Sequence, residues 1–160
     1  VTGESTCLAI EEDMEVIYID VIDGGDGMLK IMQRIGKRAP LHSTGVGKLM
    51  LTQYSLDKLN YLAQERGLAS LTPHTLTSIQ DLLLEIDQIR KQGYAVDDEE
   101  CELGARCVAA PIYDYEGRIV AAISVSGPIS RITRKRVLEL APVVIEASNK
   151  ISEIMAYKKN

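Results

Sequence analysis

Two pairs of β-rich runs, each joined by a short turn, constrain the fold more than any other feature of the sequence. In the first pair, residues 5–10 and 14–22 flank Glu11-Glu12-Asp13, and the second run is rich in β-branched residues. In the second pair, residues 104–113 and 117–126 are joined by a turn that contains Asp and Gly. Because a short turn connects only antiparallel neighbours, both pairs are predicted to be hairpins in an antiparallel sheet.

Helical patterns fill the middle and the end of the chain. Apolar residues recur at helical spacing over residues 79–89, Gly93 ends this run, and Thr77 is predicted to cap its start. A last helix is predicted to begin at Thr133 and to be kinked at Pro142. A further β-rich run is predicted at residues 28–33.

The order strands, helices, strands, helix predicts an α+β fold in which a curved antiparallel sheet is flanked by helices. A chain of 160 residues with 46% apolar composition has the size and the core of one domain, predicted over residues 1–160. No apolar run approaches the roughly 18 residues of a membrane-spanning helix. The sequence begins at Val1 and not at Met, so we expect a piece of a longer protein.

The charge and aromatic content disfavour direct binding of nucleic acid. The chain has 18 basic and 23 acidic residues, for a net charge of -5, and it contains neither Trp nor Phe. It therefore lacks both the cationic surface for a phosphate backbone and the usual stacking platform for bases. The three cysteines, Cys7, Cys101 and Cys107, have no framework spacing, which indicates free thiols in a reducing cytoplasm.

One glycine-rich segment, His42-Ser43-Thr44-Gly45-Val46-Gly47-Lys48, precedes a predicted helix that Ser43 or Thr44 caps. Backbone N–H groups at such a helix start can bind an anion. The segment is not a phosphate-binding P-loop, which requires Gly at the position of His42. Close packing of the helix through its small residues is the alternative interpretation.

Two serines and a cysteine are predicted to share one face of the second hairpin. Strand periodicity places Ser124 and Ser126 together, with Cys107 and Ala109 on one face of the preceding strand. Two hydroxyls and a thiol could line a small pocket, or the serines could mark a solvated face.

The run 97–102 contains five acidic residues in six. Its spacing does not match a calcium-binding loop, so we predict a solvated charge run and no metal site. The only histidines, His42 and His74, lie in no nucleophile–base motif, and Cys107 lies in an apolar run where a thiol is usually protonated. We predict no catalytic residue, no metal and no cofactor.

Four separated segments, in order along the chain, resemble the C-terminal effector-binding domain of the isocitrate lyase regulator (IclR) family of bacterial transcription regulators. These segments are Ala39 to Lys48, Arg90 to Glu100, Gly104 to Ile112 and Ala122 to Pro128. The resemblance covers nearly the whole chain.

The resemblance implies a GAF-like, profilin-like domain that binds a small organic acid and is not an enzyme. It implies assembly as a homodimer or homotetramer in the cytoplasm. Operator DNA would be bound only by an N-terminal winged helix-turn-helix, which this chain lacks.

The resemblance also implies an effector site. The carboxylate would meet the backbone N–H groups of Gly45 and Val46. The polar contacts would come from Asp97, Cys107, Ser124 and Ser126, and the apolar walls from Met28, Ile31, Ala39 and Ala105. Ala39 and Ala105 are smaller than the usual Leu, which predicts a wider cavity, whereas Val46 in place of a commoner Ala predicts a narrower one.

Two other functions remain open on the sequence alone. The domain could be an oligomerisation module without a functional ligand site. The domain could also be an enzyme that uses Cys107 or a metal held by the acidic run.

Overall fold

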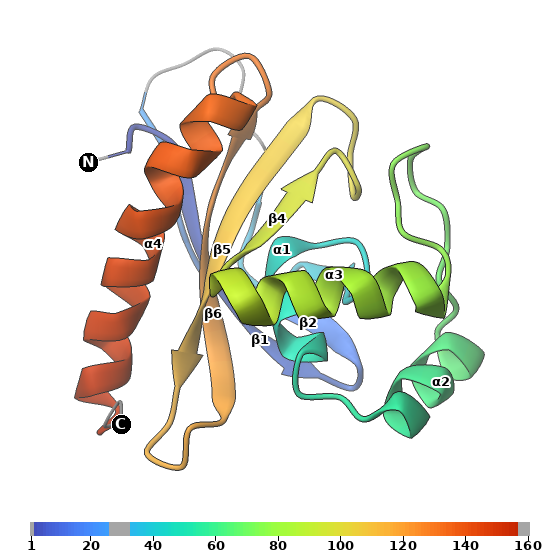
Figure 1. Cartoon of the computed structure of the whole chain (residues 1–160). Coiled ribbons are helices and arrows are strands. Elements are labelled where there is room, and N and C mark those ends of the chain that lie inside the picture. The colour runs from blue at the N-terminus through green and yellow to red at the C-terminus, as the bar shows by residue number, and fades with distance from the viewer. Residues whose placement is uncertain (1, 26–32, 157–160) are drawn as a thin grey trace.

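A single six-stranded antiparallel sheet, with the strand order β3-β2-β1-β6-β5-β4, forms the centre of the protein. The computed structural model describes residues 2–25 and 33–156. The strands are β1 (Ser5–Glu12), β2 (Glu15–Ile22), β3 (Arg38–Pro40), β4 (Ala95–Asp98), β5 (Ala105–Tyr113) and β6 (Ile119–Pro128). The helices are α1 (Gly45–Leu51), α2 (Leu56–Glu65), α3 (Ile79–Gln92) and α4 (Arg134–Ile154). The sheet is strongly curled, with α4 on one side and α1 and α3 on the other (Figure 1).

Both predicted hairpins are confirmed. β1 pairs with β2 and β5 pairs with β6, and β1 also pairs with β6, so the two hairpins join edge to edge in the middle of the sheet. β6 extends two residues beyond the predicted end, because Gly127 and Pro128 still pair with Arg106 and Ala105. The β-run predicted at residues 28–33 lies outside the described residues apart from Gln33, which is in no strand.

Each face of the sheet has its own apolar core. Alternation along β5 sends Val108, Ala110 and Ile112 to the α4 side, where they pack with apolar residues of that helix. The opposite face packs against α1, α2 and α3. The predicted α+β architecture, a curved antiparallel sheet flanked by helices, is confirmed.

The start of α1 is held by its cap and by a close backbone contact. Thr44 Oγ1 accepts a hydrogen bond from Gly47 N at 3.1 Å and donates one to Pro40 O at 2.9 Å, so Thr44, and not Ser43, is the cap. A Cβ atom at Gly47 would lie within 2.5 Å of Leu41 Cα and would also overlap Leu41 O. The second glycine of the segment is therefore required by packing.

The cap of α3 differs from the sequence prediction, and the last helix contains its proline as predicted. Ser78, not Thr77, caps α3, since its Oγ accepts the N–H of Asp81 at 3.1 Å. α4 continues through Pro142 as one helix. The carbonyl that Pro142 cannot bond belongs to Leu138, which is exposed, so water can satisfy it.

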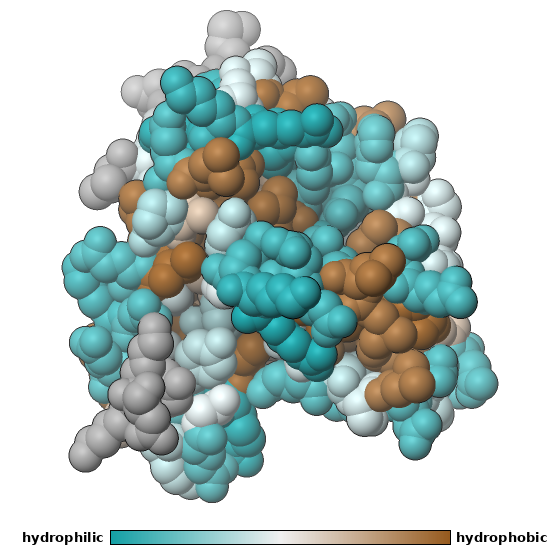
Figure 2. Space-filling model, viewed as in Figure 1, coloured by the Kyte–Doolittle hydropathy of each residue, from teal (hydrophilic) through white to brown (hydrophobic). Residues whose placement is uncertain are grey.

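The surface seen in Figure 2 is largely hydrophilic. An apolar area lies over α2, α3 and the loop between them, where Leu56, Leu71 and Leu84 are exposed.

Replacing Gly47 by Ala should lower the free energy of unfolding by about 1–3 kcal/mol, because the added methyl overlaps backbone that cannot move aside. Urea denaturation measures this change. Gly25→Ala is the matched control, since a Cβ there meets nothing within 4 Å, and it should change stability by less than about 0.5 kcal/mol. Equal stability of the two variants would contradict this account of the helix start.

Candidate functional site

Cross-strand pairing gathers the polar residues of the sheet into two neighbouring rows. Asp97 pairs with Cys107, Cys107 with Ser126, and Ser126 with Ser5. In the next row, Ser124 lies between Ala109 and Cys7. Directly paired residues point to the same face of a sheet, so these hydroxyls, thiols and the carboxylate share one face.

The N-terminus of α1 lies directly over these rows. A Cβ atom at Gly45 would be 3.3 Å from Ala109 Cβ and 3.4 Å from Cys107 Sγ. Among the described residues, the amides of Gly45 and Val46 have no hydrogen-bond acceptor, as is usual in the first turn of a helix. The two interpretations of the glycine segment are thus compatible, because close packing brings free N–H groups to the sheet face.

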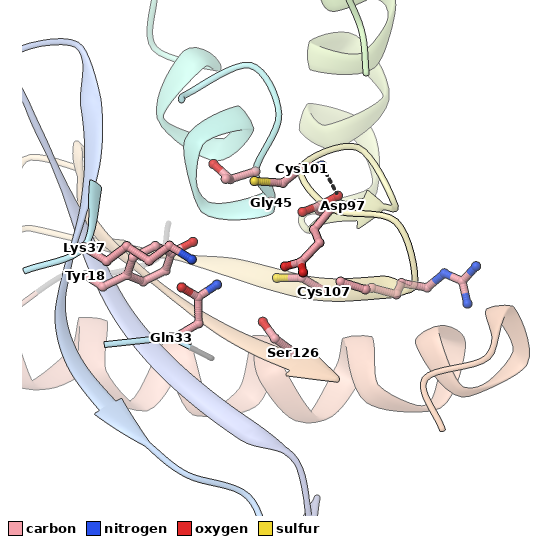
Figure 3. A pocket seen from close by; sticks show the side chains of 12 residues that line it. Tyr18, Gln33, Lys37, Gly45, Asp97, Cys101, Cys107 and Ser126 are labelled. Carbon is pink, nitrogen blue, oxygen red and sulfur yellow. Dashed lines mark hydrogen bonds between the residues drawn. The ribbon is translucent and has the colours of Figure 1, made fainter. Parts of the chain in front are cut away.

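A pocket with an accessible volume of about 40 Å³ lies where this helix start meets the sheet (Figure 3). It is lined by Tyr18, Gln33, Lys37, Thr44, Gly45, Asp97, Cys101, Glu102, Ala105, Arg106, Cys107 and Ser126. Side chains from the sheet, the β4–β5 loop and the segment before β3 therefore converge on one space.

The structure brings five of the residues singled out from the sequence to this pocket: Gly45, Asp97, Ala105, Cys107 and Ser126. Val46, Ser124 and Ala39 are buried beside it and do not line it. Met28 and Ile31 lie outside the described residues. Ser124 and Ser126 are both buried, so the alternative of a solvated serine face is wrong.

Sequence reasoning missed Tyr18, Gln33, Lys37 and Cys101 as pocket residues. Tyr18 could have been found, because it alternates with the inward-facing Val16 along β2. The loop residues carried no comparable periodic signal.

Asp97 both stabilises a turn and faces the pocket. Its Oδ1 accepts hydrogen bonds from Glu100 N at 2.8 Å and Cys101 N at 3.3 Å, which fixes the turn after β4. Burial raises the pKa of Asp97 to about 6, and these hydrogen bonds together with Lys48 limit the rise. The carboxyl group at the pocket therefore titrates near neutral pH.

Cys107 is a neutral thiol. Burial raises its pKa to about 12, the nearby Asp97 adds to this rise, and its contacts with Ser126 and Ser124 oppose it. The prediction of a protonated thiol agrees with this direction, and such a group is a poor nucleophile.

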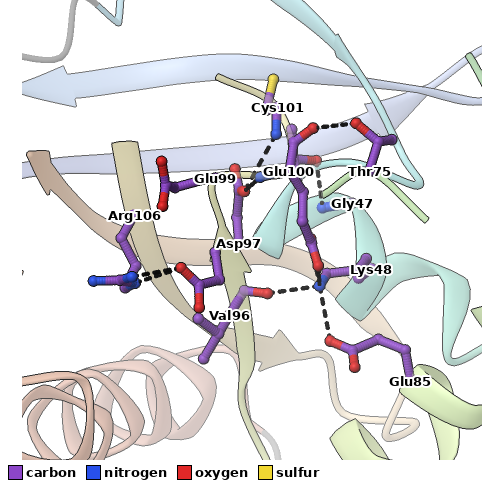
Figure 4. Close-up of polar contacts among 12 residues, drawn as sticks. Gly47, Lys48, Thr75, Glu85, Val96, Asp97, Glu99, Glu100, Cys101 and Arg106 are labelled. Carbon is purple, nitrogen blue, oxygen red and sulfur yellow. Dashed lines mark hydrogen bonds and ion pairs between the residues drawn. The ribbon is translucent and has the colours of Figure 1, made fainter. Parts of the chain in front are cut away.

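Lys48 is fully buried behind the pocket and joins three elements (Figure 4). Its Nζ donates to Glu85 Oε1 of α3 at 2.8 Å and to Val96 O of β4 at 2.6 Å, and it lies 2.7 Å from Glu100 Oε2. Burial alone would lower the pKa of Lys48, but Glu100 and Glu85 outweigh it, and the pKa is raised. Lys48 is therefore a charged lysine that ties α1 to the turn carrying Asp97.

The prediction that residues 97–102 form a solvated charge run is wrong. Asp97 caps a turn, Asp98 binds Arg106 and Arg134, and Glu100 binds Lys48. The carbonyls of the run are also held, since the hydroxyls of Thr72 and Thr75 donate to Glu99 O and Glu100 O, each at 2.6 Å. Across residues 2–25 and 33–156, no group of three His, Cys, Asp or Glu side chains is placed to hold a metal ion.

The fold is that of the C-terminal domains of bacterial transcription regulators. The family model described as "Bacterial transcriptional regulator IclR C-terminal" matches residues 1–153. The chain belongs to the IclR family, and the part that it represents is the C-terminal domain.

Curated relatives agree with this assignment. The chain is 40% identical over 153 residues to the transcriptional repressor IclR of Escherichia coli, covering 94% of this chain and 56% of the relative. It is 36% identical over 157 residues to the repressor AllR of the same species, covering 98% and 58%. The chain thus spans a little over half the length of these relatives, which are named as repressors and not as enzymes.

Solved structures show the same fold. The IclR protein of Thermotoga maritima superposes with a TM-score of 0.89 at 35% identity, covering 98% of this chain and 63% of that one. The C-terminal domain of the Escherichia coli regulator KdgR superposes with a TM-score of 0.85 at 35% identity, covering 98% and 90%. Within the described part of the chain, no helix has the length and apolarity to cross a membrane.

Lys48→Met should lower the free energy of unfolding by about 3–5 kcal/mol, because it leaves Glu100 and Glu85 near one another without their cation. Urea denaturation measures the loss, and adding Glu100→Gln should recover part of it. Lys150→Met, which removes an exposed pair with Glu146, is the control and should leave stability nearly unchanged. A small effect of Lys48→Met would contradict the structural importance of this cation.

Asp97→Asn should change the pH dependence of stability. The native state holds the proton of Asp97 up to about pH 6, whereas the unfolded chain releases it near pH 3.8, so this group makes wild-type stability fall as pH rises through that window. At about 1.4 kcal/mol per pKa unit, the fall amounts to about 3 kcal/mol.

The side-chain oxygen of the Asp97→Asn variant can still accept the two backbone N–H groups, so the variant should lack this fall and keep the turn. Urea midpoints of both proteins from pH 4 to pH 8 provide the test. Parallel profiles would show that Asp97 is not the titrating group.

Proposed function

We propose that this domain binds a small organic acid in the pocket between the start of α1 and the polar rows of the sheet, and that it regulates a transcription factor in response. The observation that carries the proposal is the convergence of the free amide of Gly45 with the side chains of Cys107 and Ser126 on one pocket. Hydrogen-bond donors placed around an anion in a desolvated pocket form strong, charge-assisted bonds.

Each side chain has a defined contribution in this proposal. The amide of Gly45 and the hydroxyl of Ser126 donate to the carboxylate, and the free amide of Val46, which lies beside the pocket, adds to the positive end of the helix. Cys107 is neutral and adds a weak donor without repelling the anion. An ionised Asp97 would repel a carboxylate, so it accepts a hydroxyl or a water from the rest of the ligand.

The pocket walls limit the size of the ligand. Ala105 lines the cavity, and its small side chain leaves room beside Cys107. Ala39 and Ser124 support the site from behind, and Met28 and Ile31 are assigned to the apolar wall by the resemblance to relatives. The pocket is small, which favours an acid of few atoms.

The regulatory part of the proposal concerns the whole protein. We place residues 1–160 as a single effector-binding domain of a cytoplasmic homodimer or homotetramer, with operator DNA bound by an N-terminal winged helix-turn-helix. An effector that binds two arrangements of the assembly with unequal affinity shifts the population between them and thereby changes DNA binding. The repressor names of the curated relatives support this role.

Titration calorimetry with glyoxylate, pyruvate, glycerate and malonate tests the proposal. At least one acid should bind the wild type, and Ser126→Ala should weaken that binding about tenfold or more, because a hydrogen bond to a charged group contributes about 1.5–3 kcal/mol. Ser130→Ala removes an exposed hydroxyl that does not line the pocket and should leave binding unchanged.

A wild-type protein that binds none of these acids, yet forms a stable oligomer, would contradict the sensing role. That result would favour the oligomerisation module. Binding that Ser126→Ala leaves unchanged would place the ligand elsewhere.

A further inference from the structure

We propose that Lys37 supplies the positive charge that makes this pocket select anions, and that it thereby determines the charge of the effector. The proposal rests on the pocket being the ligand site described above. Lys37 is a loop residue that lies outside the four segments that resemble the IclR family.

Lys37 is directed into the pocket. It lines the cavity, and Figure 3 shows its side chain lying along Tyr18 with the amino group toward the interior, on a different wall from Ser126 and Asp97. Its positive charge lowers the pKa values of both Cys7 and Cys101, against the larger effect of burial that raises them. The ammonium group therefore acts electrostatically on two cysteines on different parts of the site.

The backbone holds Lys37 in this position. Tyr18 N donates to Lys37 O at 3.1 Å, and Gly36 N donates to Tyr18 O at 2.7 Å, so the loop is hydrogen-bonded to β2. Gly36 adopts a φ of +84°, which allows the turn that brings the next residue back over the sheet. The side chain is thus positioned by paired backbone and not by a free loop.

The charges around the pocket make Lys37 the decisive cation. Asp97 and the exposed Glu102 both line the pocket and would repel an anion. Arg106 also lines it, but its guanidinium is bound to Asp98 at 2.6 Å and to Ile132 O at 2.6 Å. Among the described residues, Lys37 makes no ion pair, so its charge remains available to a ligand.

A single ammonium facing two carboxyl groups also limits the ligand. One carboxylate can pair with Lys37 and the amide of Gly45, whereas a second carboxylate would face Asp97 or Glu102 without a cation. The geometry therefore points to a small monocarboxylate and not to a dicarboxylate.

Two thiol reagents of similar shape test the charge assignment without knowledge of the natural effector. Iodoacetate is a small carboxylate and iodoacetamide is its neutral counterpart, and both alkylate a thiolate with loss of iodide. Peptide mass spectrometry at pH 8.5 gives the alkylation rates of Cys101 and Cys107 in the wild type, in Lys37→Gln and in Lys37→Arg. Lys91→Gln, which removes an exposed lysine of α3, is the matched control.

The ratio of the iodoacetate rate to the iodoacetamide rate should fall about tenfold in Lys37→Gln and stay near the wild-type value in Lys37→Arg and Lys91→Gln. An equal ratio in the wild type and Lys37→Gln overturns the proposal. Where alkylation is too slow to measure, acetate and acetamide titrations followed by the amide NMR signals of Gly45 and Cys107 make the same comparison. Saturable acetate shifts that Lys37→Gln removes support the proposal, and wild-type signals that acetate does not move overturn it.

The two proposals fail separately. An acid that binds the wild type and Lys37→Gln equally in calorimetry contradicts the role of Lys37 and leaves the sensing function intact. If the ratio of alkylation rates depends on Lys37 but the protein binds none of the four acids in calorimetry, the role of Lys37 is supported and the sensing function is contradicted. Malonate that binds as tightly as pyruvate contradicts the preference for one carboxylate.

Discussion

The buried ammonium of Lys48 is the interaction on which the pocket depends. A seven-residue helix such as α1 is too short to be stable alone, and its position must come from tertiary contacts. Lys48 fixes it to Glu85, to the carbonyl of Val96 and to Glu100, with no exposure to water. Since Glu100 belongs to the same turn that Asp97 caps, this one cation holds both the helix that forms one side of the pocket and the turn that forms another.

The pairing of the strands fixes the positions of the polar side chains that the sheet brings to the pocket. Register fixes Asp97, Cys107 and Ser126 side by side, and a slip of one residue in any of the three strands would send that strand's member of the row to the α4 face. The apolar residues that alternate with them, such as Val108 and Val125, are buried against α4, so a slip would remove them from that core. The hydrophobic core thereby secures the alignment of the polar row.

The same alternation explains which parts of the structure could be predicted from sequence. Both hairpins, the helix at residues 79–92 and the shared face of Cys107 and Ser126 follow from local periodicity, which the structure keeps. The partners of Glu100 and the position of Lys37 could not be predicted, because they depend on segments that are distant in sequence and meet only in the fold. The acidic run illustrates this: its composition is that of a solvated surface, and only the buried Lys48 and Arg106 show it to be a structural turn.

Strand β4 contributes one carboxylate to each face of the sheet, Asp97 on the pocket side and Asp98 on the α4 side. As neighbours on β4 they point to opposite faces, so that Asp97 faces the pocket and Asp98 binds Arg106 and Arg134 on the α4 side. Arg106 in turn bonds Ile132 O just before α4, and Arg134 lies in the first turn of that helix. Two consecutive residues of β4 therefore connect the turn at the pocket with the ion pairs at the start of α4, because Asp97 accepts the N–H groups of that turn and Asp98 binds Arg106 and Arg134.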